Sequence, residues 1–327
     1  MILAGDIGGT KTNLALYEIK NNVLHSVAQC QYINREFSSL TAMFSAFKKK
    51  YAIEKIDAAS FGIAGPVIDG YCSITNLSWD ISRDTLKDYW HSDKVYLLND
   101  LEATAYGMLY LREDEFEDLN PEGQVIEGNC AVLAAGTGLG EAMLFFDGES
   151  YQPIASEGGH SDFAPLTELQ DDLLKWLRFR YPEHVSYERI LSGPGIYLLY
   201  EFLLERSDVR LDDPLLEIPE GKDRSAVITD RALKEQDPLC LEVLSLFAEI
   251  YGAEAGNLAL KSMSLGGVYI GGGIMPKILC RMTKEQFMNG FTAKGRFRNI
   301  LQGMQVKISL NPETALLGAA HYALDRL

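Results

Sequence analysis

Alternating hydrophobic and polar positions at the start of the chain predict a β-meander with a glycine turn inside it. The apolar run 2–5 ends in the loop Gly5-Asp-Ile-Gly-Gly-Thr10, and residues 13–19 then alternate as a half-buried strand does. A third strand is expected over 23–32, after the Asn21-Asn22 turn. The first glycine loop is therefore expected to join two neighbouring strands of the meander.

Apolar residues at helical spacing recur further along and alternate with buried strands, which is typical of an α/β protein. Helices are expected at 39–51, 101–111, 170–181, 195–205, 229–234, 239–262, 276–282 and 312–327. Further strands are expected at 58–64, 71–75, 95–98, 130–135, 267–270 and 306–310, together with an apolar run that ends at Phe146.

The length of the chain and one acidic segment suggest two domains. With 327 residues the chain is long enough for two domains that share a cleft. The acidic segment 112–123 contains Pro121 and Gly123 at its end and is the candidate crossing between them. We predict a small α/β domain of residues 1–110 plus the C-terminal helix 312–327, and a large α/β domain of residues 111–311.

A second glycine loop, Gly136-Thr-Gly-Leu-Gly140, follows the buried run 130–135. The hairpin signal Asp147-Gly148 predicts that strands follow this loop, where a dinucleotide-binding fold needs a helix. The first loop nearly matches the Walker A pattern, but Thr10 replaces its second glycine and a strand follows it. Each loop alone is compatible with a plain hairpin. Two such loops after buried strands favour a nucleotide held by backbone N–H groups between two lobes.

A third glycine cluster brackets the strand around residues 268–270, with Gly266-Gly267 before it and Gly271-Gly272-Gly273 after it. Glycines at this place allow a flat purine to approach the backbone. Close packing of a helix against the strand, taken alone, explains them better.

The pair Asn99-Asp100 stands between the apolar run 95–98 and the helical pattern 101–111. A carboxylate at a strand-to-helix junction can face a cleft, and the free N–H groups of the helix help to keep it ionised. An ionised, positioned carboxylate can accept a proton from an alcohol. Asp is also a common helix N-cap, but that interpretation gives Asn99 no role.

Polar residues around two glycines form a candidate sugar site. The glycines between Glu157 and His160 argue against a helix and allow both side chains to turn the same way, and Glu188 follows further on. Carboxylates and an imidazole suit sugar hydroxyls, which both donate and accept. A lone His is more often structural, and zinc would need a third ligand at typical spacing. The run Thr75-Asn76-Leu-Ser-Trp79 adds polar groups beside an aromatic ring, although an Asx turn with a helix cap explains it equally well.

The composition excludes several classes of function. The net charge of −16 argues against nucleic acid and against an anionic membrane as partners, because both need clustered cations. The five cysteines are scattered without a Cys-x-x-Cys pair, as expected for reduced thiols in a cytoplasmic protein. We expect neither a secretory signal nor a membrane-spanning segment. Backbone N–H groups and Mg²⁺ still allow the chain to bind phosphate.

Over essentially its whole length the chain resembles the bacterial ATP-dependent glucokinases, which are related to the ROK sugar kinases and to the hexokinase and actin-like ATPase superfamily. The resemblance rests on the order and spacing of these motifs: Gly5-Asp-Ile-Gly-Gly-Thr10, Gly62-Ile-Ala-Gly-Pro66, Thr75-Asn76 with Trp79, Leu98-Asn-Asp100, Gly136-Thr-Gly-Leu-Gly140, Glu157-Gly-Gly-His-x-Asp-Phe-Ala-Pro165, Glu188-Arg-Ile-Leu-Ser-Gly-Pro-Gly195, Gly256-Asn257, Gly271-Gly-Gly-Ile274, Lys294-Gly-Arg-Phe297 and Asn311-Pro312.

The resemblance implies a two-lobed actin-like ATPase fold of the ribonuclease H-like kind, with a cleft between a small and a large domain. It implies transfer of the γ-phosphate of ATP to the 6-hydroxyl of glucose, giving glucose 6-phosphate and ADP, a reaction of glycolysis in which Asp100 is the general base. The implied sugar ligands are Asn99, Asp100, Glu157, His160, Glu188 and Asn76. The implied nucleotide-binding residues are Gly5, Asp6, Ile7, Gly8, Gly9, Thr10, Gly136, Thr137, Gly138 and Gly272.

The same resemblance implies ATP and Mg²⁺ as cofactors, with Asp6 near the metal through water or phosphate, and a homodimer in the cytoplasm. Zinc is not expected, because the cysteine-rich motif of many ROK kinases is absent after His160. One alternative is a related hexose or N-acylhexosamine kinase. Another is a sugar-sensing ROK-type regulator, which would need a DNA-binding segment before the strand that starts at Ile2. A filament-forming actin-like ATPase would not need Glu157, His160 and Glu188 together.

Overall fold

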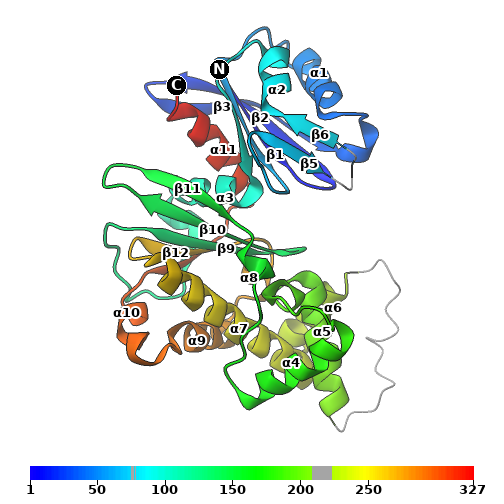
Figure 1. Cartoon of the computed structure of the whole chain (residues 1–327), viewed down its shortest axis with the longest axis vertical. Helices are drawn as coiled ribbons and strands as arrows, with labels where there is room; N and C mark the ends of the chain where they lie inside the picture. Colours follow the sequence, from blue (N-terminus) through cyan, green and yellow to red (C-terminus); the bar gives the residue numbers. More distant parts are fainter. Residues whose placement is uncertain (75–76, 78, 208–222) are drawn as a thin grey trace. The chain divides into compact units, whose positions relative to one another are not determined.

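The structure is a computed structural model that describes residues 1–74, 77, 79–207 and 223–327 (Figure 1). The chain divides into two compact units. The first unit comprises Met1–Glu115, Ser150–Ala155 and Asn311–Leu327, and the second comprises Phe116–Glu149 and Ser156–Leu310.

The first unit is built on a five-stranded sheet in the order β3-β2-β1-β4-β7. Its strands are β1 (Ile2–Ile7), β2 (Lys11–Lys20), β3 (Val23–Ile33), β4 (Ala58–Ile63) and β7 (Val95–Asn99). The strands β1, β2 and β3 form an antiparallel meander, while β1, β4 and β7 run parallel. The predicted meander with its glycine turn is thereby confirmed.

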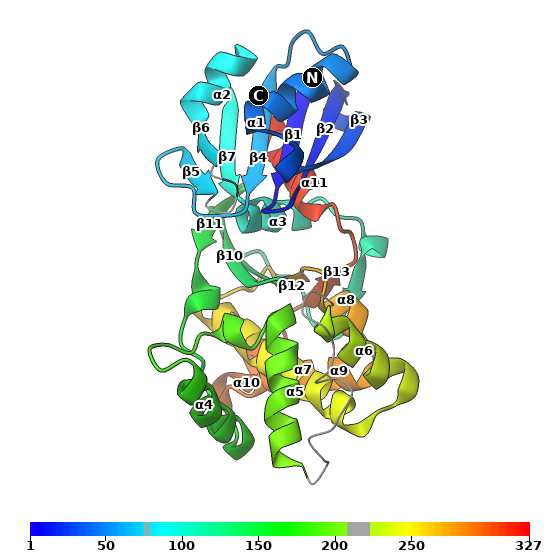
Figure 2. The ribbon, with the colours of Figure 1, turned by 90° about the vertical axis from the view of Figure 1, so that its right-hand side faces the viewer.

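Both faces of this sheet are covered, which explains why β1 and β4 read as continuous apolar runs. Leu3 packs with the side of the sheet that α1 and α2 cover, and its neighbour Ala4 packs with α11 on the other side. In Figures 1 and 2, α11 lies against α3 and β1. The helices are α1 (Leu40–Lys50), α2 (Arg83–Trp90), α3 (Asp100–Met108) and α11 (Thr314–Leu324), and a small separate hairpin is formed by β5 (Tyr71–Ile74) and β6 (Trp79–Ser82).

The second sheet has the order β11-β10-β9-β12-β13-β8. Its strands are β8 (Phe116–Asp118), β9 (Cys130–Ala135), β10 (Leu139–Phe146), β11 (Tyr151–Ser156), β12 (Gly267–Gly271) and β13 (Val306–Ser309). The strands β9 and β10 are antiparallel, and β9, β12 and β13 are parallel. Apart from β8, this order repeats the strand order of the first sheet, although the two halves of the sequence show no recognisable repeat.

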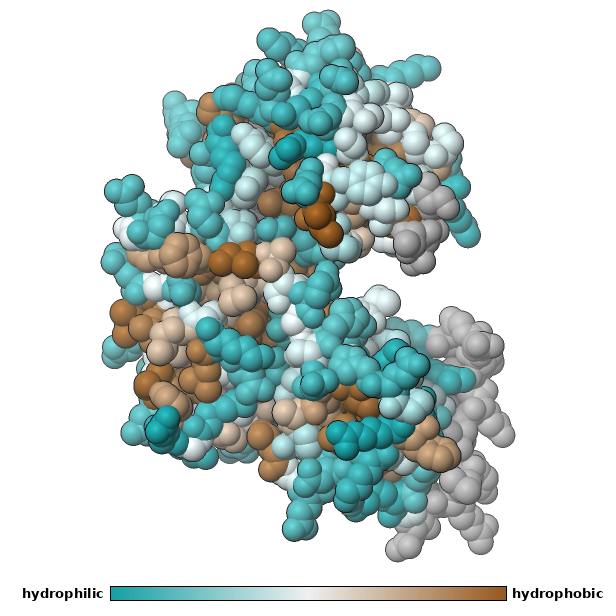
Figure 3. All heavy atoms as spheres, viewed as in Figure 1, coloured by the Kyte–Doolittle hydropathy of each residue, from teal (hydrophilic) through white to brown (hydrophobic). Residues whose placement is uncertain are grey.

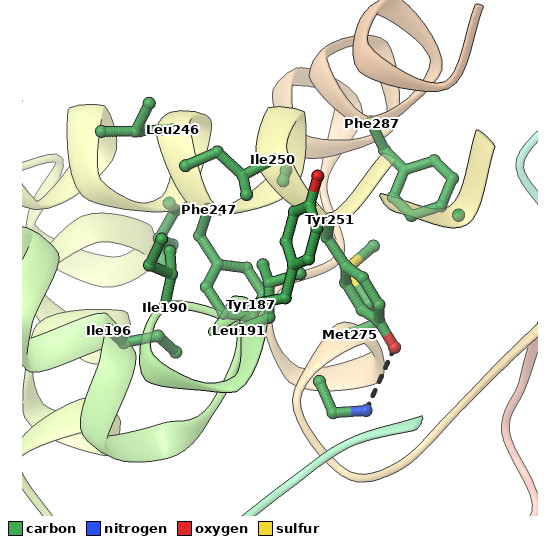
Figure 4. Packing of buried hydrophobic residues seen from close by; sticks show 14 of the residues in the cluster. Tyr187, Ile190, Leu191, Ile196, Leu246, Phe247, Ile250, Tyr251, Met275 and Phe287 are labelled. Carbon is green, nitrogen blue, oxygen red and sulfur yellow. Dashed lines mark hydrogen bonds between the residues drawn. The ribbon is translucent and has the colours of Figure 1, made fainter. Parts of the chain in front are cut away.

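The helices of the second unit gather around the long, buried helix α7 (Figure 2). This helix packs against α5, α6 and α9 and against β9. Figure 4 shows its core side chains, among them Phe247, Ile250 and Tyr251, packed with Tyr187 and Phe287. The helices are α4 (Glu168–Arg180), α5 (Gly193–Arg206), α6 (Arg224–Glu235), α7 (Pro238–Ser262), α8 (Met275–Ile278), α9 (Arg281–Thr292) and α10 (Arg298–Gln302).

Some predicted elements differ from the observed ones. The single helix expected at 276–282 is wrong, because the chain is extended at Leu279 and Cys280 and a longer helix, α9, starts at Arg281. Helix α6 starts at Arg224, before the predicted residue 229, because the Asp223 carboxylate accepts from Ala226 N and caps it. The acidic segment after residue 111 contains β8, which pairs with β13.

Hydrophilic residues are spread over the face drawn in Figure 3, with hydrophobic side chains among them. Across the described ranges, every helix is too short or too polar to cross a lipid bilayer.

Candidate functional site

The first glycine loop lies at the carboxyl end of β1, and only part of the predicted motif forms the turn. Gly5, Asp6 and Ile7 are strand residues, and the Ile7 side chain is buried in the core. The turn consists of Gly8, Gly9 and Thr10, with Gly8 N donating to Lys11 O over 3.0 Å. A Cβ added at Gly9 would meet no atom within 4 Å. The glycine therefore leaves open space in front of the backbone, as a phosphate group requires.

A residue that the sequence analysis did not single out, Asn34, holds this loop in place. It is fully buried just after β3, and its Nδ2 donates to Gly8 O over 2.7 Å. Its Oδ1 accepts from the Thr12 hydroxyl over 2.8 Å, and its backbone N donates to Thr10 O over 2.9 Å. Asn34 thus holds the turn and the start of β2 through three hydrogen bonds, two from its side chain and one from its backbone N–H group. The sequence offers one signal for this role, which is the position of the Asn directly after a strand and opposite a glycine turn.

Asp6 is half-buried beside the turn and is the candidate metal-binding residue. Burial raises the pKa of its carboxyl, and the hydrogen bond from Asn13 Nδ2, at 3.3 Å, lowers it in part. Gln31 Nε2 in turn donates to Asn13 Oδ1 over 2.9 Å. Hard cations such as Mg²⁺ prefer carboxylate oxygens, so the donor type fits. Among the residues described there is no cluster of three acidic, His or Cys side chains that could hold a metal by itself.

The second glycine loop joins β9 to β10 and is held by other elements of the second unit. Gly136 N donates to Gly138 O over 2.8 Å, and Gly136 O accepts from Gly193 N at the start of α5 over 2.8 Å. A Cβ on Gly136 would meet no atom within 4 Å. Gly272, at the end of β12, has a φ of +79° and its Cβ would lie 2.3 Å from Ala135 O, so only glycine fits there. Its role is close packing against β9.

A cavity in the second unit with a volume of about 950 Å³ begins at this loop. Gly136 and Thr137 line one part of it, and Gly273 and Lys277 line another. The remaining wall comes from α5 and α6, where the Arg224 guanidinium lies 4.5 Å from the centre of the Tyr197 ring. The sequence analysis did not identify Tyr197, Arg224 or Lys277. A cavity of this size with aromatic, glycine and cationic walls suits a nucleotide.

The predicted sugar residues of the second unit lie on two turns that are bonded to each other. Gly158–His160 forms one turn of 3₁₀ helix, although its glycines argued against a helix, and Tyr187–Arg189 forms another. Tyr187 N donates to Ser161 O over 3.1 Å. The His160 Nδ1 atom lies 3.8 Å from Glu188 Oε1, and both side chains remain accessible. Glu157 is exposed at the start of the first turn. Three groups suited to sugar hydroxyls are therefore presented together.

Glu188 also contacts the second glycine loop. Its Oε2 accepts from Leu139 N over 3.0 Å. A Cβ on Gly138 would lie 2.4 Å from the same oxygen, so a side chain there would displace the carboxylate. The loop that lines the nucleotide cavity and the turn that carries Glu188 are therefore directly connected within the second unit.

In the first unit, Asn99 ends β7 and caps α3, and Asp100 is the first residue of that helix. Asn99 Oδ1 accepts from Leu101 N over 2.8 Å, and Glu102 Oε2 accepts from Asn99 N over 2.8 Å, which completes a capping box. The interpretation of Asp100 as the N-cap is therefore wrong: Asn99 is the cap. This assignment leaves the Asp100 carboxylate at the positive end of the helix dipole.

Asn99 makes a second hydrogen bond, which already uses the side-chain amide that is predicted to bind the sugar. Its Nδ2 donates to Gly65 O over 3.1 Å, and the residue is 8% exposed. The amide thus fixes the junction of β4, β7 and α3. Because β1, β4 and β7 are parallel, the first glycine loop and Asp100 share the carboxyl edge of this sheet, where α/β proteins bind ligands. The remaining candidate ligand, Asn76, lies outside the described residues.

Comparisons with known proteins agree with these features. The family model described as Glucokinase matches residues 3–326. The chain is 38% identical to a glucokinase from Nostoc punctiforme over 333 residues, with 98% of each chain covered. Its structure resembles a crystal structure of glucokinase from an Antarctic psychrotroph, with a TM-score of 0.86, 31% identity and coverage of 99% and 98%. A ROK family glucokinase from Streptomyces griseus, in complex with glucose and AMPPNP, shares the fold with a TM-score of 0.66 at 18% identity and 99% coverage of each chain.

The two repeated sheets and the two glycine loops place the chain among the ATP-dependent sugar kinases with the actin-like ATPase fold. Within that class, the match over nearly the whole chain shows that it belongs to the glucokinase family.

Proposed function

We propose that this chain transfers the γ-phosphate of ATP to the 6-hydroxyl of glucose, with Asp100 as the general base. The observation that supports it best is the direct bond between Glu188 and the second glycine loop. A loop that lines the nucleotide cavity and also contacts a sugar-binding turn suits a group transfer between the two ligands. The Streptomyces griseus structure, which holds glucose and an ATP analogue, supports the same pair of substrates.

In this proposal the second unit binds the base and ribose of ATP in the cavity behind Gly136 and Thr137. The backbone N–H groups of the two glycine loops bind the phosphates, which needs no net positive charge on the protein. Mg²⁺, held near Asp6, supplies charge compensation on the phosphates when it is bound. Phosphoryl transfer passes through a loose transition state, so positioning and charge compensation supply most of the catalysis.

Asp100 receives the hydroxyl proton in this mechanism. Its place in the first turn of α3 favours the ionised carboxylate, since the free N–H groups of the helix lie next to it. Asn99 and Glu102 fix the start of the helix and therefore the direction of the Asp100 backbone. Glu157, His160 and Glu188 would bind the other hydroxyls and set the orientation of the ring.

The test of the base is the pair of variants Asp100→Asn and Asp100→Ala. We expect kcat to fall about 10³-fold in both, which is within the range for loss of a general base, while the affinity for glucose changes far less. Stopped-flow or coupled ADP-release kinetics gives kcat, and calorimetry gives the sugar affinity. Asp84→Asn, an exposed change in the first turn of α2, is the matched control. Asp100→Asn with more than a tenth of normal kcat would refute the assignment.

A panel of sugars tests the substrate. ADP release is measured with glucose, mannose, fructose, N-acetylglucosamine and N-acetylmannosamine at equal concentrations. The proposal requires the highest kcat/KM with glucose. A higher value with an N-acylated sugar would replace it by an N-acylhexosamine kinase.

We also propose Mg²⁺ dependence, a homodimer and a cytoplasmic location, which follow the family resemblance. Loss of activity in EDTA with recovery on adding Mg²⁺ tests the first. Sedimentation velocity at micromolar concentration tests the second, and cell fractionation tests the third.

A further inference from the structure

Behind the two sugar-binding turns lies a buried polar network that the proposed mechanism does not use. Glu141 on β10 is 1% exposed and Glu254 on α7 is 0% exposed. Among the residues described, each carboxyl has one oxygen, Oε1, without a hydrogen-bond partner. Two ionised carboxylates, each with one oxygen that lacks a donor, would be very costly at this depth.

The network reaches the sugar turns at two points. A Cβ on Gly158 would lie 2.1 Å from Glu141 Oε2, so this carboxyl is packed directly against the turn between Glu157 and His160. On the other side, Asn257 Nδ2 donates to Glu254 Oε2 over 2.8 Å and to the Tyr187 hydroxyl over 3.1 Å. Tyr187 precedes Glu188 in the second turn, and Figure 4 shows its hydroxyl pointing toward α7.

Two sequence motifs that had no role become part of this network. Gly256 allows α9 and the stem of Lys294 to approach α7, because a Cβ there would lie 2.5 Å from Phe291 O and 2.9 Å from Lys294 Cε. The Lys294 ammonium then donates to Asn257 Oδ1 over 2.6 Å. The motifs Gly256-Asn257 and Lys294-Gly-Arg-Phe297 therefore fix the amide that connects Glu254 to Tyr187.

We propose that Glu141 and Glu254 share one proton and that this carboxyl pair is a positioning device for the sugar-binding turns. The inference rests on the proposed function, since it concerns the binding of glucose to those turns. With the proton present, one carboxyl donates to the other and Glu141 stays in place against Gly158. Without it, two buried negative charges repel each other next to the turn and displace Glu157 and His160.

Burial of the pair favours a bound proton. Burial raises the pKa of Glu141, and the charge of Glu254 raises it further. Lys261 opposes this effect, but its ammonium is mostly exposed and lies 3.7 Å from Glu254 Oε1. Burial also raises the pKa of Glu254. The other titratable groups that interact with the pair are Tyr187, Tyr251 and Lys294.

The test measures glucose affinity by calorimetry from pH 7 to pH 10, without nucleotide. A carboxyl changed to an amide keeps a donor at every pH, so Glu141→Gln should bind glucose with an affinity that is flat over this range. The wild-type affinity should fall by up to tenfold for each pH unit above the pKa of the pair. Glu242→Gln, an exposed change on the same helix α7, is the control and should follow the wild type.

Coupled assays at the same pH values should show the change in the KM for glucose, with a smaller change in kcat. Calorimetry in two buffers of different ionisation enthalpy measures protons directly, and the wild type should take up protons when it binds glucose above the pKa of the pair. If Glu141→Gln fails to fold, the same measurements are made on Glu254→Gln, together with the count of protons taken up by the wild type. The shared proton is refuted if glucose binds with the same pH profile to the wild type and to the amide variant, or if binding takes up no protons. Either result leaves the proposed function intact. Absence of glucose binding and phosphorylation at every pH overturns the proposed function as well.

Discussion

The glycine loop of the first unit and the glycine loop of the second unit both join antiparallel strands at the carboxyl end of a buried strand. Their supports differ. The first loop is fixed by Asn34, a buried side chain with no part in binding sugar. The second is bonded to Glu188, a candidate sugar ligand, and to Gly193 at the start of the helix that walls the nucleotide cavity.

This difference separates two ways of building a phosphate site. In the first loop, the residue that holds the turn is not one of the proposed ligands. A substitution of that residue should therefore lower the stability of the protein and its affinity for the nucleotide. In the second loop, the support is Glu188, itself a proposed sugar ligand, so the same damage should also weaken sugar binding. Variants of the two loops should therefore give different patterns of KM for the two substrates.

Among the variants that compare the two loops, the largest effect is expected from Gly138→Ala. The new Cβ would lie 2.4 Å from Glu188 Oε2, so the carboxylate must move away from both Leu139 N and His160. Misplacement by about 1 Å costs about 100-fold in rate, so kcat/KM should fall by about that factor for glucose and for ATP. Steady-state kinetics with each substrate varied in turn measures it.

Gly303→Ala is the control for this prediction. A Cβ at Gly303 meets its nearest atom at an ordinary 3.5 Å, so this change should leave both KM values intact. If Gly138→Ala raised only the KM for ATP, Glu188 would not be a sugar ligand held by the loop, and the contrast between the two loops would fail.

Asn34→Ala is expected to have the next largest effect, and on one substrate only. It removes the bonds to Gly8 O and the Thr12 hydroxyl at a fully buried position, which should cost about 2 kcal/mol of unfolding free energy. The freed turn should raise the KM for ATP about tenfold, because roughly 1.4 kcal/mol of positioning is lost. The KM for glucose should stay within about twofold. Urea unfolding and two-substrate kinetics measure these quantities.

Asn129→Ala separates instability from loop damage. Asn129 also bridges two backbone groups, donating to Ser262 O and accepting from Phe146 N, but it lies just before β9, at the opposite end of this strand from the second glycine loop. The Asn129→Ala protein should lose a similar amount of unfolding free energy, while its KM values for ATP and glucose stay normal. An equal rise in the KM for ATP in both variants would mean that Asn34 has no specific role.

Most of the fold was predictable because its strands are short apolar runs with strong turn signals between them. The β-meander, the second strand–loop–strand unit and the helix α7 follow from periodicity alone. Helix α9 was missed because its apolar face is sparse and its start depends on Cys280 and Thr283, which cap each other. That start is fixed by local hydrogen bonds, which a hydrophobic pattern does not record.

At the candidate site, the sequence predicts residues whose type suits the chemistry, as with Asp100, Glu157, His160 and Glu188, and their roles stay predictions. The sequence does not predict residues that act through a fold contact. Asn34 is 26 positions from Gly8, and Glu141 meets Gly158 only after the 3₁₀ turn Gly158–His160, which follows β11, packs against β10. Such pairings depend on tertiary structure. The N-cap is a finer case, since Asn and Asp are almost equally good caps and only the geometry shows that Asn99 takes the role.

The smallest effects are expected from Gly9→Ala and Gly136→Ala, which compare the two loops most directly. At both positions an added Cβ meets no protein atom within 4 Å, and neither glycine has a positive φ. The unfolding free energy should therefore change by less than about 1 kcal/mol. If phosphate approaches both turns, each methyl group weakens one backbone contact of about 1 kcal/mol and raises the KM for ATP about fivefold. Thermal unfolding with and without AMPPNP provides the check, because the shift in Tm caused by the nucleotide should shrink equally in the two variants. A full shift in Gly9→Ala would assign phosphate binding to the second loop alone.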